Sequence, residues 1–220
     1  MYRFLRSIII GPLVRIFYRP TSRGLENIPR TGAVVFASNH ISFIDPVFLA
    51  VVAPRPISFL AKSEYFTGKG IPGRLSRWFF RSIGQLPINR AGGAASEASL
   101  GGGREHLANG GWLGVYPEGT RSEDGLLHRG RTGVARVVLE SGVPVIPVGI
   151  TGTDGVMPLG SRFPKIHAVD VAFGPPLDFS ALHGSAADGA TLRSVTDQIM
   201  QAIGALSGQQ YDDSYATRSR

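Results

Sequence analysis

The sequence predicts an α/β protein: a single-domain αβ sandwich whose mixed, largely buried sheet is flanked by helices, plus an N-terminal amphipathic membrane-associating helix. Short apolar runs of strand length alternate along the chain with segments of helical periodicity, which is the pattern of this fold class. Of the 220 residues, 43% are hydrophobic, which is enough to build a core. The length is that of one domain.

The elements follow one another in a regular order. Apolar runs that predict strands occupy residues 33–38, 57–61, 112–116, 143–150 and 168–173. Helical patterns occupy residues 46–52, 94–109, 133–141 and 192–206. The glycines at 101–103 are expected to break or loosen the helix that contains them. Short continuous apolar runs are typical of buried strands, so we expect a mostly covered sheet.

Three segments make up the chain. Residues 1–20 are strongly apolar, but Arg3, Arg6 and Arg15 interrupt them, and the uncharged run Ser7–Val14 is too short to span a bilayer. We expect an interfacial helix whose arginines reach the lipid headgroups, or alternatively a helix packed on the domain. The segment lacks a small-residue cleavage site, so no secretory signal is expected. Residues 21–206 form the folded domain, and the polar residues 207–220 form a flexible tail.

The charge is unevenly distributed. The formal net charge is +7, and residues 1–90 hold 13 Lys and Arg against three acidic residues, whereas residues 91–220 hold 10 against 13. This predicts an anionic partner such as a membrane or a phosphorylated molecule. No nucleic-acid recognition motif accompanies the charge, so a nucleic-acid partner is not expected. The absence of cysteine excludes disulfides, thiolate metal sites and a cysteine nucleophile.

Residues 71–83 carry a clear amphipathic pattern. Arg74, Arg77 and Arg81 share one side of the predicted helix, opposite aromatic and aliphatic side chains. This arrangement suits a membrane surface or a phosphate-bearing ligand. An ordinary surface helix with a solvated face is the alternative.

The segment NHISFID (39–45) directly follows the first predicted strand. His40 therefore lies at the mouth of the sheet, and Asp45, five residues later, comes within reach if the chain turns into a helix. A carboxylate that holds one imidazole nitrogen leaves the other nitrogen as a general base. A structural role is the alternative, because an isolated His–Asp spacing is a weak signal. Ser42 is expected to cap the helix that carries Asp45.

The segment YPEGTRS (116–122) follows another predicted strand and is the most specific of the motifs. Glu118 offers an acceptor for a hydroxyl group, and Arg121 offers donors for a phosphate. Gly119 allows close backbone approach, and nearby N–H groups are candidates for stabilising an oxyanion. A polar turn held by an internal Glu118–Arg121 pair is the alternative.

Two further segments complete the set. GQLPINR (84–90) is strand-like and ends in Arg90, whose guanidinium suits a phosphate, although such an arginine is also a common surface residue. VPVIPV (143–148) offers no chemistry and is expected to be an apolar wall. Lys62, after the second predicted strand, is a further phosphate-binding candidate.

Together, in this order, the four segments resemble the motifs NHxSxxD, GxxxIxR, FPEGTRS and VPVIPV of the glycerolipid acyltransferase family, and most closely the 1-acylglycerol-3-phosphate acyltransferases that make phosphatidic acid. The resemblance covers roughly residues 25–175. Two positions depart from the family pattern. Tyr116 replaces the usual Phe, and Arg131 stands where the family often has Lys.

The resemblance implies acyl transfer from acyl-CoA or acyl carrier protein, as co-substrate, to the free hydroxyl of lysophosphatidate. It implies no cofactor and no metal, and an enzyme associated with the anionic cytoplasmic face of the cell membrane. His40 would be the general base and Asp45 its orienting partner. The resemblance implies that Arg90, Glu118, Gly119 and Arg121 bind the acceptor or its phosphate, and Lys62 and Thr120 are further candidates from their positions. The candidates near the oxyanion or the acyl donor are Gly119, Arg74, Arg77 and Arg81.

Three alternatives remain at this point. The acceptor of the same reaction could be glycerol 3-phosphate or another lipid head group. A metal-dependent hydrolase would use His40, Asp45 and Asp124 as ligands, without a metal-site spacing to support it. A non-catalytic, basic membrane-binding module would explain the charge but not the YPEGTRS segment.

Overall fold

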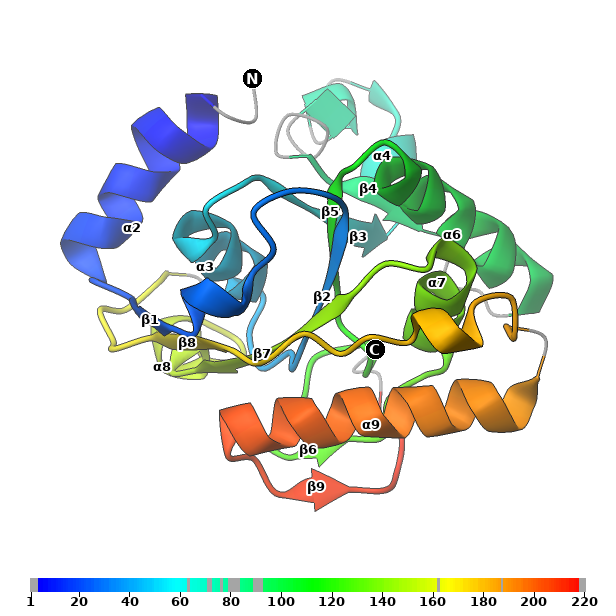
Figure 1. The fold of residues 1–220 in the computed structure, drawn as a ribbon. Helices are drawn as coiled ribbons and strands as arrows, with labels where there is room; N and C mark the ends of the chain where they lie inside the picture. The colour runs from blue at the N-terminus through cyan, green and yellow to red at the C-terminus, as the bar shows by residue number, and fades with distance from the viewer. Residues whose placement is uncertain are drawn as a thin grey trace.

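A computed structural model describes residues 4–62, 64–70, 73–75, 77–78, 84–88, 93–161, 163–186 and 188–217. The centre of this part of the chain is a seven-stranded sheet in the order β1-β8-β7-β2-β5-β3-β4 (Figure 1). Its strands, in sheet order, are β1 (Thr21–Arg23), β8 (Asp170–Phe173), β7 (Val145–Thr151), β2 (Val34–Ser38), β5 (Trp112–Val115), β3 (Ile57–Lys62) and β4 (Leu86–Ile88). Neighbouring strands are parallel except for β7 and β8, so the sheet is mixed, as predicted.

Helices cover both faces of the sheet. On one face lie α6 (Gly93–Ala108), α7 (Gly133–Ser141) and α9 (Gly189–Ser207), and on the other lie α3 (Asp45–Val52) and the N-terminal helix (Figure 1). Alternate residues of β2 point to opposite faces. Val35 packs in the core beneath α6, α7 and α9, and Val34 and Phe36 pack in the core beneath α3 and the N-terminal helix. Apolar residues therefore occupy successive positions of the strand, because neither face meets water.

The smaller elements are short. They are η2 (Leu25–Asn27), α4 (Glu64–Thr67), α8 (Thr153–Val156), η3 (Ser180–Leu182), and a second sheet of β6 (Leu127–His128) with β9 (Tyr211–Asp212). Of the predicted helix over residues 71–83, the described positions 73–75 and 77–78 are helical, and the rest lie outside the described residues. In the described part of the chain, no helix is long and apolar enough to cross a membrane.

Helix α6 passes without a break through the three glycines, contrary to the expectation of a break. A Cβ on Gly103 would come within 3.2 Å of Leu113 in β5, so the missing side chain lets the helix approach the sheet closely. Tight packing against β5 offsets the low helix propensity of glycine.

The N-terminal helix, which runs from η1 (Leu5–Ile10) into α2 (Gly11–Phe17), packs on α3. Val14 is buried in that contact. The arginines do not simply extend toward headgroups, as the sequence suggested: Arg6 donates to the carbonyls of Ala50 and Ala53, and Arg15 donates to that of Val51 at 3.1 Å. Both arginines satisfy carbonyls at the C-terminal end of α3, which have no partner within the helix.

The C-terminal segment is folded rather than a free tail. Strand β9 pairs in parallel with β6, and the Ser214 carbonyl accepts the Arg129 N–H at 2.9 Å. The ring of Tyr215 lies under the guanidinium groups of Arg129 and Arg131. Polar composition suggested a flexible tail, but backbone pairing and aromatic–guanidinium contacts attach this segment to the domain.

Candidate active site

The predicted site residues gather at one edge of the sheet because the strands that precede them are parallel. Strands β2, β3, β5 and β7 run in the same direction, so the segments that follow them emerge together. NHISFID follows β2, YPEGTRS follows β5, and α8 follows β7. The edge beyond the carboxyl ends of strands is the usual place for a site in an α/β sheet.

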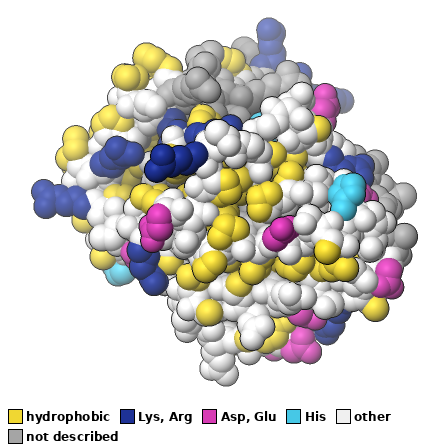
Figure 2. Space-filling model, in the orientation of Figure 1, with side chains coloured by type: hydrophobic (Ala, Val, Ile, Leu, Met, Phe, Trp, Pro, Cys, Tyr) yellow, Lys and Arg dark blue, Asp and Glu magenta, His cyan; other side chains and the backbone are white. Residues whose placement is uncertain are grey.

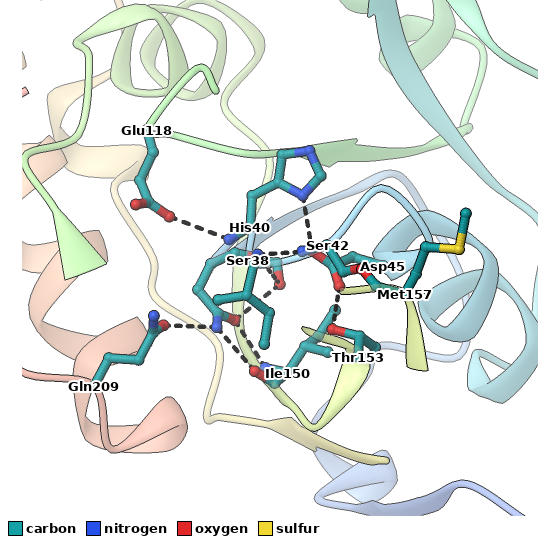
Figure 3. Close-up of polar contacts among 11 residues, drawn as sticks. Ser38, His40, Ser42, Asp45, Glu118, Ile150, Thr153, Met157 and Gln209 are labelled. Carbon is teal, nitrogen blue, oxygen red and sulfur yellow. Dashed lines mark hydrogen bonds and ion pairs between the residues drawn. The ribbon is translucent and has the colours of Figure 1, made fainter. Parts of the chain in front are cut away.

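His40 and Asp45 form the central pair (Figure 3). His40 Nδ1 lies 2.8 Å from Asp45 Oδ2, the contact for which the five-residue spacing allowed. The Asp45 carboxyl is fully buried, whereas 17% of the His40 side chain is exposed. In the described part of the chain, His40 Nε2 has no hydrogen-bond partner. The pair therefore presents one imidazole nitrogen to an incoming molecule.

Four donors hold the Asp45 carboxylate. Besides the imidazole, Oδ2 accepts the N–H groups of Ile41 and Ser42, both at 2.9 Å, and Oδ1 accepts the hydroxyl of Thr153. Because Asp45 acts as acceptor in each contact, the proton of neutral His40 is placed on Nδ1. Ser42 does not cap α3 with its hydroxyl, as expected from its position; that hydroxyl donates to the Met157 carbonyl at 3.2 Å.

Aromatic stacking fixes the plane of the imidazole. The His40 and Tyr116 rings are stacked with centroids 4.0 Å apart and an interplanar angle of 19°, and Phe59 stacks on the other side of Tyr116 at 6.0 Å. Burial raises the pKa of the Tyr116 hydroxyl well above its ordinary value. The Phe that the resemblance expected at this position would keep the same ring contact.

Glu118 braces the backbone of the site. It is fully buried, and its two oxygens accept the N–H groups of His40 and His128, each at 3.1 Å. Among the described residues it forms no ion pair with Arg121, which was the alternative to the predicted contact with the acceptor. Burial raises the pKa of Glu118 to about 7, while the two backbone N–H groups act in the opposite direction.

The loop after Glu118 is held against His40. The Ser122 N–H donates to the His40 carbonyl at 2.7 Å. Gly119 has a φ of 76°, and a Cβ there would come within 3.0 Å of the Arg131 side chain, so the turn requires glycine. The Gly119 N–H donates to the Tyr116 carbonyl at 3.0 Å and is therefore already engaged. The guanidinium of Arg121 pairs with no carboxylate in the described residues.

The remaining predicted residues are placed only in part. Lys62 is the last residue of β3, at the same edge of the sheet, but its side chain lies outside the described residues. Arg90 and Arg81 also lie outside them. Arg74 is exposed, and Arg77 donates to the Gly68 carbonyl at 3.4 Å. Of the apolar side chains described in this segment, Leu75 and Trp78 are exposed.

The Asp124 of the metal-hydrolase alternative belongs to another cluster. Its carboxylate lies 3.0 Å from His128 Nε2 and accepts the Ser122 hydroxyl at 3.0 Å. The Leu126 N–H holds the pKa of Asp124 below its usual range. Within the described ranges, no three metal-ligating side chains come together in a possible metal site.

The motifs in this geometry are those of a known family. A family model described as "Acyltransferase" matches residues 19–151. The chain belongs to the acyltransferase family. Its fold is similar to the crystal structure of the 1-acyl-sn-glycerophosphate acyltransferase PlsC from Thermotoga maritima, with a TM-score of 0.69 and 27% identity over 90% of this chain and 76% of that chain.

Curated relatives in this acyltransferase family have related names. A chloroplastic 1-acyl-sn-glycerol-3-phosphate acyltransferase of Arabidopsis thaliana is 33% identical over 189 residues, which is 85% of this chain and 50% of the relative. One from Brassica napus is 32% identical over 162 residues, 73% of this chain and 45% of the relative. The chain thus spans about half the length of these relatives.

Three side chains of this candidate site were not identified from the sequence. Thr153 reaches Asp45, Gln209 reaches Asn39, and Asn39 bonds both backbone groups of Ile150. Thr153 and Gln209 are separated from their partners by 108 and 170 positions, so no local spacing indicated the contacts. Asn39 lies inside the NHISFID motif, so of these three residues it is the one that the sequence could have indicated as part of the site.

The raised pKa of Glu118 predicts a pH-dependent stability. Its pKa moves from 4.5 to about 7 on folding, so its contribution is fully present below pH 4.5 and is lost as pH rises through 7. The unfolding free energy of the wild type, relative to Glu118→Gln, is expected to fall by about 3 kcal/mol between pH 4.5 and pH 8. Urea unfolding at several pH values measures this difference.

Glu123→Gln is the matched control, because Glu123 is exposed in the same segment. Its difference from the wild type should stay flat with pH. Parallel pH profiles for Glu118→Gln and the wild type would contradict the assignment.

Proposed function

We propose that the protein transfers a fatty acyl group from an acyl thioester to the free hydroxyl of 1-acylglycerol 3-phosphate, giving phosphatidic acid for phospholipid synthesis. The observation that carries the proposal is the His40–Asp45 pair beside the loop of Arg121, in which His40 Nε2 bonds to none of the described residues. The names of the relatives and of the Thermotoga structure support the choice of acceptor.

In the proposed mechanism, His40 Nε2 takes the proton of the acceptor hydroxyl. The hydroxyl oxygen attacks the thioester carbonyl carbon, the C–S bond breaks, and the imidazolium returns the proton to the leaving thiolate. Asp45 stabilises the charged imidazolium and keeps Nε2 directed outward. No acyl–enzyme intermediate is required, and Ser42 is a poor nucleophile here because it is buried and bonded to Met157.

The oxyanion of the tetrahedral intermediate needs N–H donors next to His40. Gly119 is engaged by Tyr116, so the donors we assign are the N–H groups of Thr120 and Arg121. In the described part of the chain these two groups have no backbone acceptor. The bond from Ser122 to the His40 carbonyl holds them close to the imidazole.

Arg121 is assigned to the acceptor phosphate. Among the described residues its guanidinium pairs with no carboxylate, and it can form charge-assisted bonds with phosphate oxygens. Arg131, whose stem lies against Gly119, is a second cation beside the same loop. Arg90 remains a proposed phosphate ligand on the strength of the family resemblance, and Lys62 remains one because it ends β3 at the same edge of the sheet.

The acyl donor is acyl-CoA or acyl carrier protein, used as a co-substrate, and the mechanism requires no resident cofactor. Arg74, Arg77 and Arg81 form a basic segment suited to the phosphates of the first or the acidic surface of the second. Assays with lysophosphatidate, glycerol 3-phosphate and monoacylglycerol, each with both donors, distinguish this activity from the other acceptors.

We also assign the molecule to an anionic membrane surface at the cytoplasmic face. The N-terminal helix packs one side on α3 and leaves the other exposed, including Phe4, Ile8, Leu13, Ile16 and Phe17. Figure 2 shows hydrophobic side chains with Lys and Arg gathered over the upper left of the molecule, where this helix lies in Figure 1. Exposed aliphatic and aromatic groups mixed with basic ones suit a lipid surface.

A second apolar surface borders the catalytic pair. We name the exposed side chains of Phe43, Leu159, Phe163 and Ile166 the apolar rim. Phe43 lies within NHISFID, and the other three lie in the loop that begins at Met157, where Ser42 is bonded. Residues 157–168 contain Arg162 and Lys165 and no acidic residue. These features support a contact of the apolar rim with an anionic lipid surface.

Replacing the proposed base tests the mechanism. His40→Ala is expected to lower kcat for lysophosphatidate by about 10²–10⁴-fold, because hydroxyl activation depends on Nε2. The measurement is steady-state release of thiol from the donor. His183→Ala, at an exposed histidine directly after η3, is the matched control and should keep wild-type turnover. Substantial turnover by a folded His40→Ala variant would overturn the assignment.

The phosphate assignment predicts a selective loss of binding. Arg121→Ala is expected to raise KM for lysophosphatidate about tenfold or more, because a charge-assisted hydrogen bond is lost. KM for unphosphorylated monoacylglycerol should change little. Arg30→Ala, at an exposed arginine, controls for net charge. An equal KM increase for both acceptors would refute this role.

The apolar rim predicts a membrane-specific defect. The double change Phe163→Ser and Ile166→Ser is expected to weaken binding to anionic phospholipid vesicles at least about tenfold, because two large apolar side chains no longer leave water. Vesicle flotation measures binding, and turnover of micelle-dispersed lysophosphatidate should be retained. Leu182→Ser, on η3, is the control. Unchanged flotation of the double variant would exclude the rim from the membrane contact.

A further inference from the structure

Gln209, in the C-terminal segment, forms a hydrogen bond with Asn39 of the NHISFID segment (Figure 3). Its Oε1 accepts an N–H of Asn39 Nδ2 at 2.7 Å, and its Nε2 donates to the carbonyls of Gly125 at 2.9 Å and Leu126 at 3.3 Å. One side-chain amide therefore joins the end of β2 to the far end of the loop that carries Arg121.

At its Oε1 end, Gln209 completes the hydrogen bonds of Asn39. Asn39 is fully buried, its Oδ1 accepts the Ile150 N–H at 2.8 Å, and its Nδ2 also donates to the Ile150 carbonyl at 2.9 Å. The second N–H of Nδ2 goes to Gln209. Without Gln209 this donor would be buried and unpaired, one residue before His40.

At its Nε2 end, Gln209 bonds the loop at Gly125 and Leu126, and backbone contacts of the residues that follow Gln209 hold the same part of the loop. The Gln210 carbonyl accepts the Leu127 N–H at 2.9 Å, and β9 continues the pairing with β6. The other end of the loop is fixed to His40 through Glu118 and Ser122. The loop between these points, which carries Thr120 and Arg121, is thus attached at both ends.

We propose that Gln209 is a positioning residue for acyl transfer: its Oε1 sets the position of His40 through Asn39, and its Nε2 sets the position of the Arg121 loop. The inference rests on the proposed function, since it assigns His40 to catalysis and Arg121 to the acceptor. It also extends the site into a segment outside the four family motifs, where composition alone indicated a flexible tail.

The two ends of the amide are expected to affect different kinetic parameters. Gln209→Met matches the shape of glutamine but removes both polar ends, so kcat is expected to fall about tenfold and KM for lysophosphatidate to rise about tenfold. Gln209→Glu keeps an acceptor for Asn39 and loses the donor to the loop, so kcat should stay near the wild-type value while KM rises.

Gln210→Ala is the matched control, because Gln210 is the exposed neighbour and the change keeps its backbone carbonyl. Its kcat and KM should equal those of the wild type. Wild-type kinetics for Gln209→Met would overturn the proposal. So would a fall in kcat for Gln209→Glu equal to that for Gln209→Met, because Asn39 would then not be the link.

Hydrogen exchange gives a readout that does not need activity. Exchange at the amides of Ser122 and Leu127, which bond the His40 and Gln210 carbonyls, is expected to quicken in Gln209→Met and not in Gln210→Ala. Unchanged exchange in Gln209→Met would also contradict the proposal. A wild type without lysophosphatidate turnover would refute the proposed function alone, since the exchange comparison would still decide whether Gln209 holds the loop.

Discussion

The arrangement around His40 depends on two carboxylates that have no exposed surface. A buried carboxylate is tolerated when donors occupy its oxygens, and here those donors are largely backbone N–H groups. Asp45 takes those of Ile41 and Ser42 together with the imidazole, and Glu118 takes those of His40 and His128. Satisfying the two carboxylates therefore fixes both the backbone and the ring of the same histidine before any substrate is bound.

The parallel sheet explains why these groups meet, but not how they are oriented. Strands β2, β5 and β7 deliver NHISFID, YPEGTRS and α8 to one edge because they run in the same direction. Two local contacts orient the side chains: the His40 ring stacks on Tyr116, and the Thr153 hydroxyl donates to Asp45. The sheet brings the loops close together, and buried polar and aromatic contacts then fix the orientation of their side chains.

Features encoded within a few residues could be predicted, and features that need distant partners could not. Strands β2, β3, β5, β7 and β8 follow from apolar runs, and the His40–Asp45 contact follows from a five-residue spacing, whereas the short strands β1, β6 and β9 were not predicted. For Glu118, residue type suggested a substrate contact, whereas its burial and the two N–H groups bonded to its oxygens appear only in the fold. Gln209 lies in a polar segment whose pairing with residues 125–129 leaves no periodic signal.

Arg6 and Arg15 of the N-terminal segment also bind the C-terminal end of α3, a role that the net charge does not indicate. Helix α3 begins at Asp45, and its C-terminal carbonyls are held by Arg6 and Arg15. An acidic group at the first turn and cations at the last complement the helix dipole at both ends. The arginines thereby attach the N-terminal helix to the helix that orients His40. The exposed apolar side of the N-terminal helix is in consequence held at a fixed orientation to the His40–Asp45 pair.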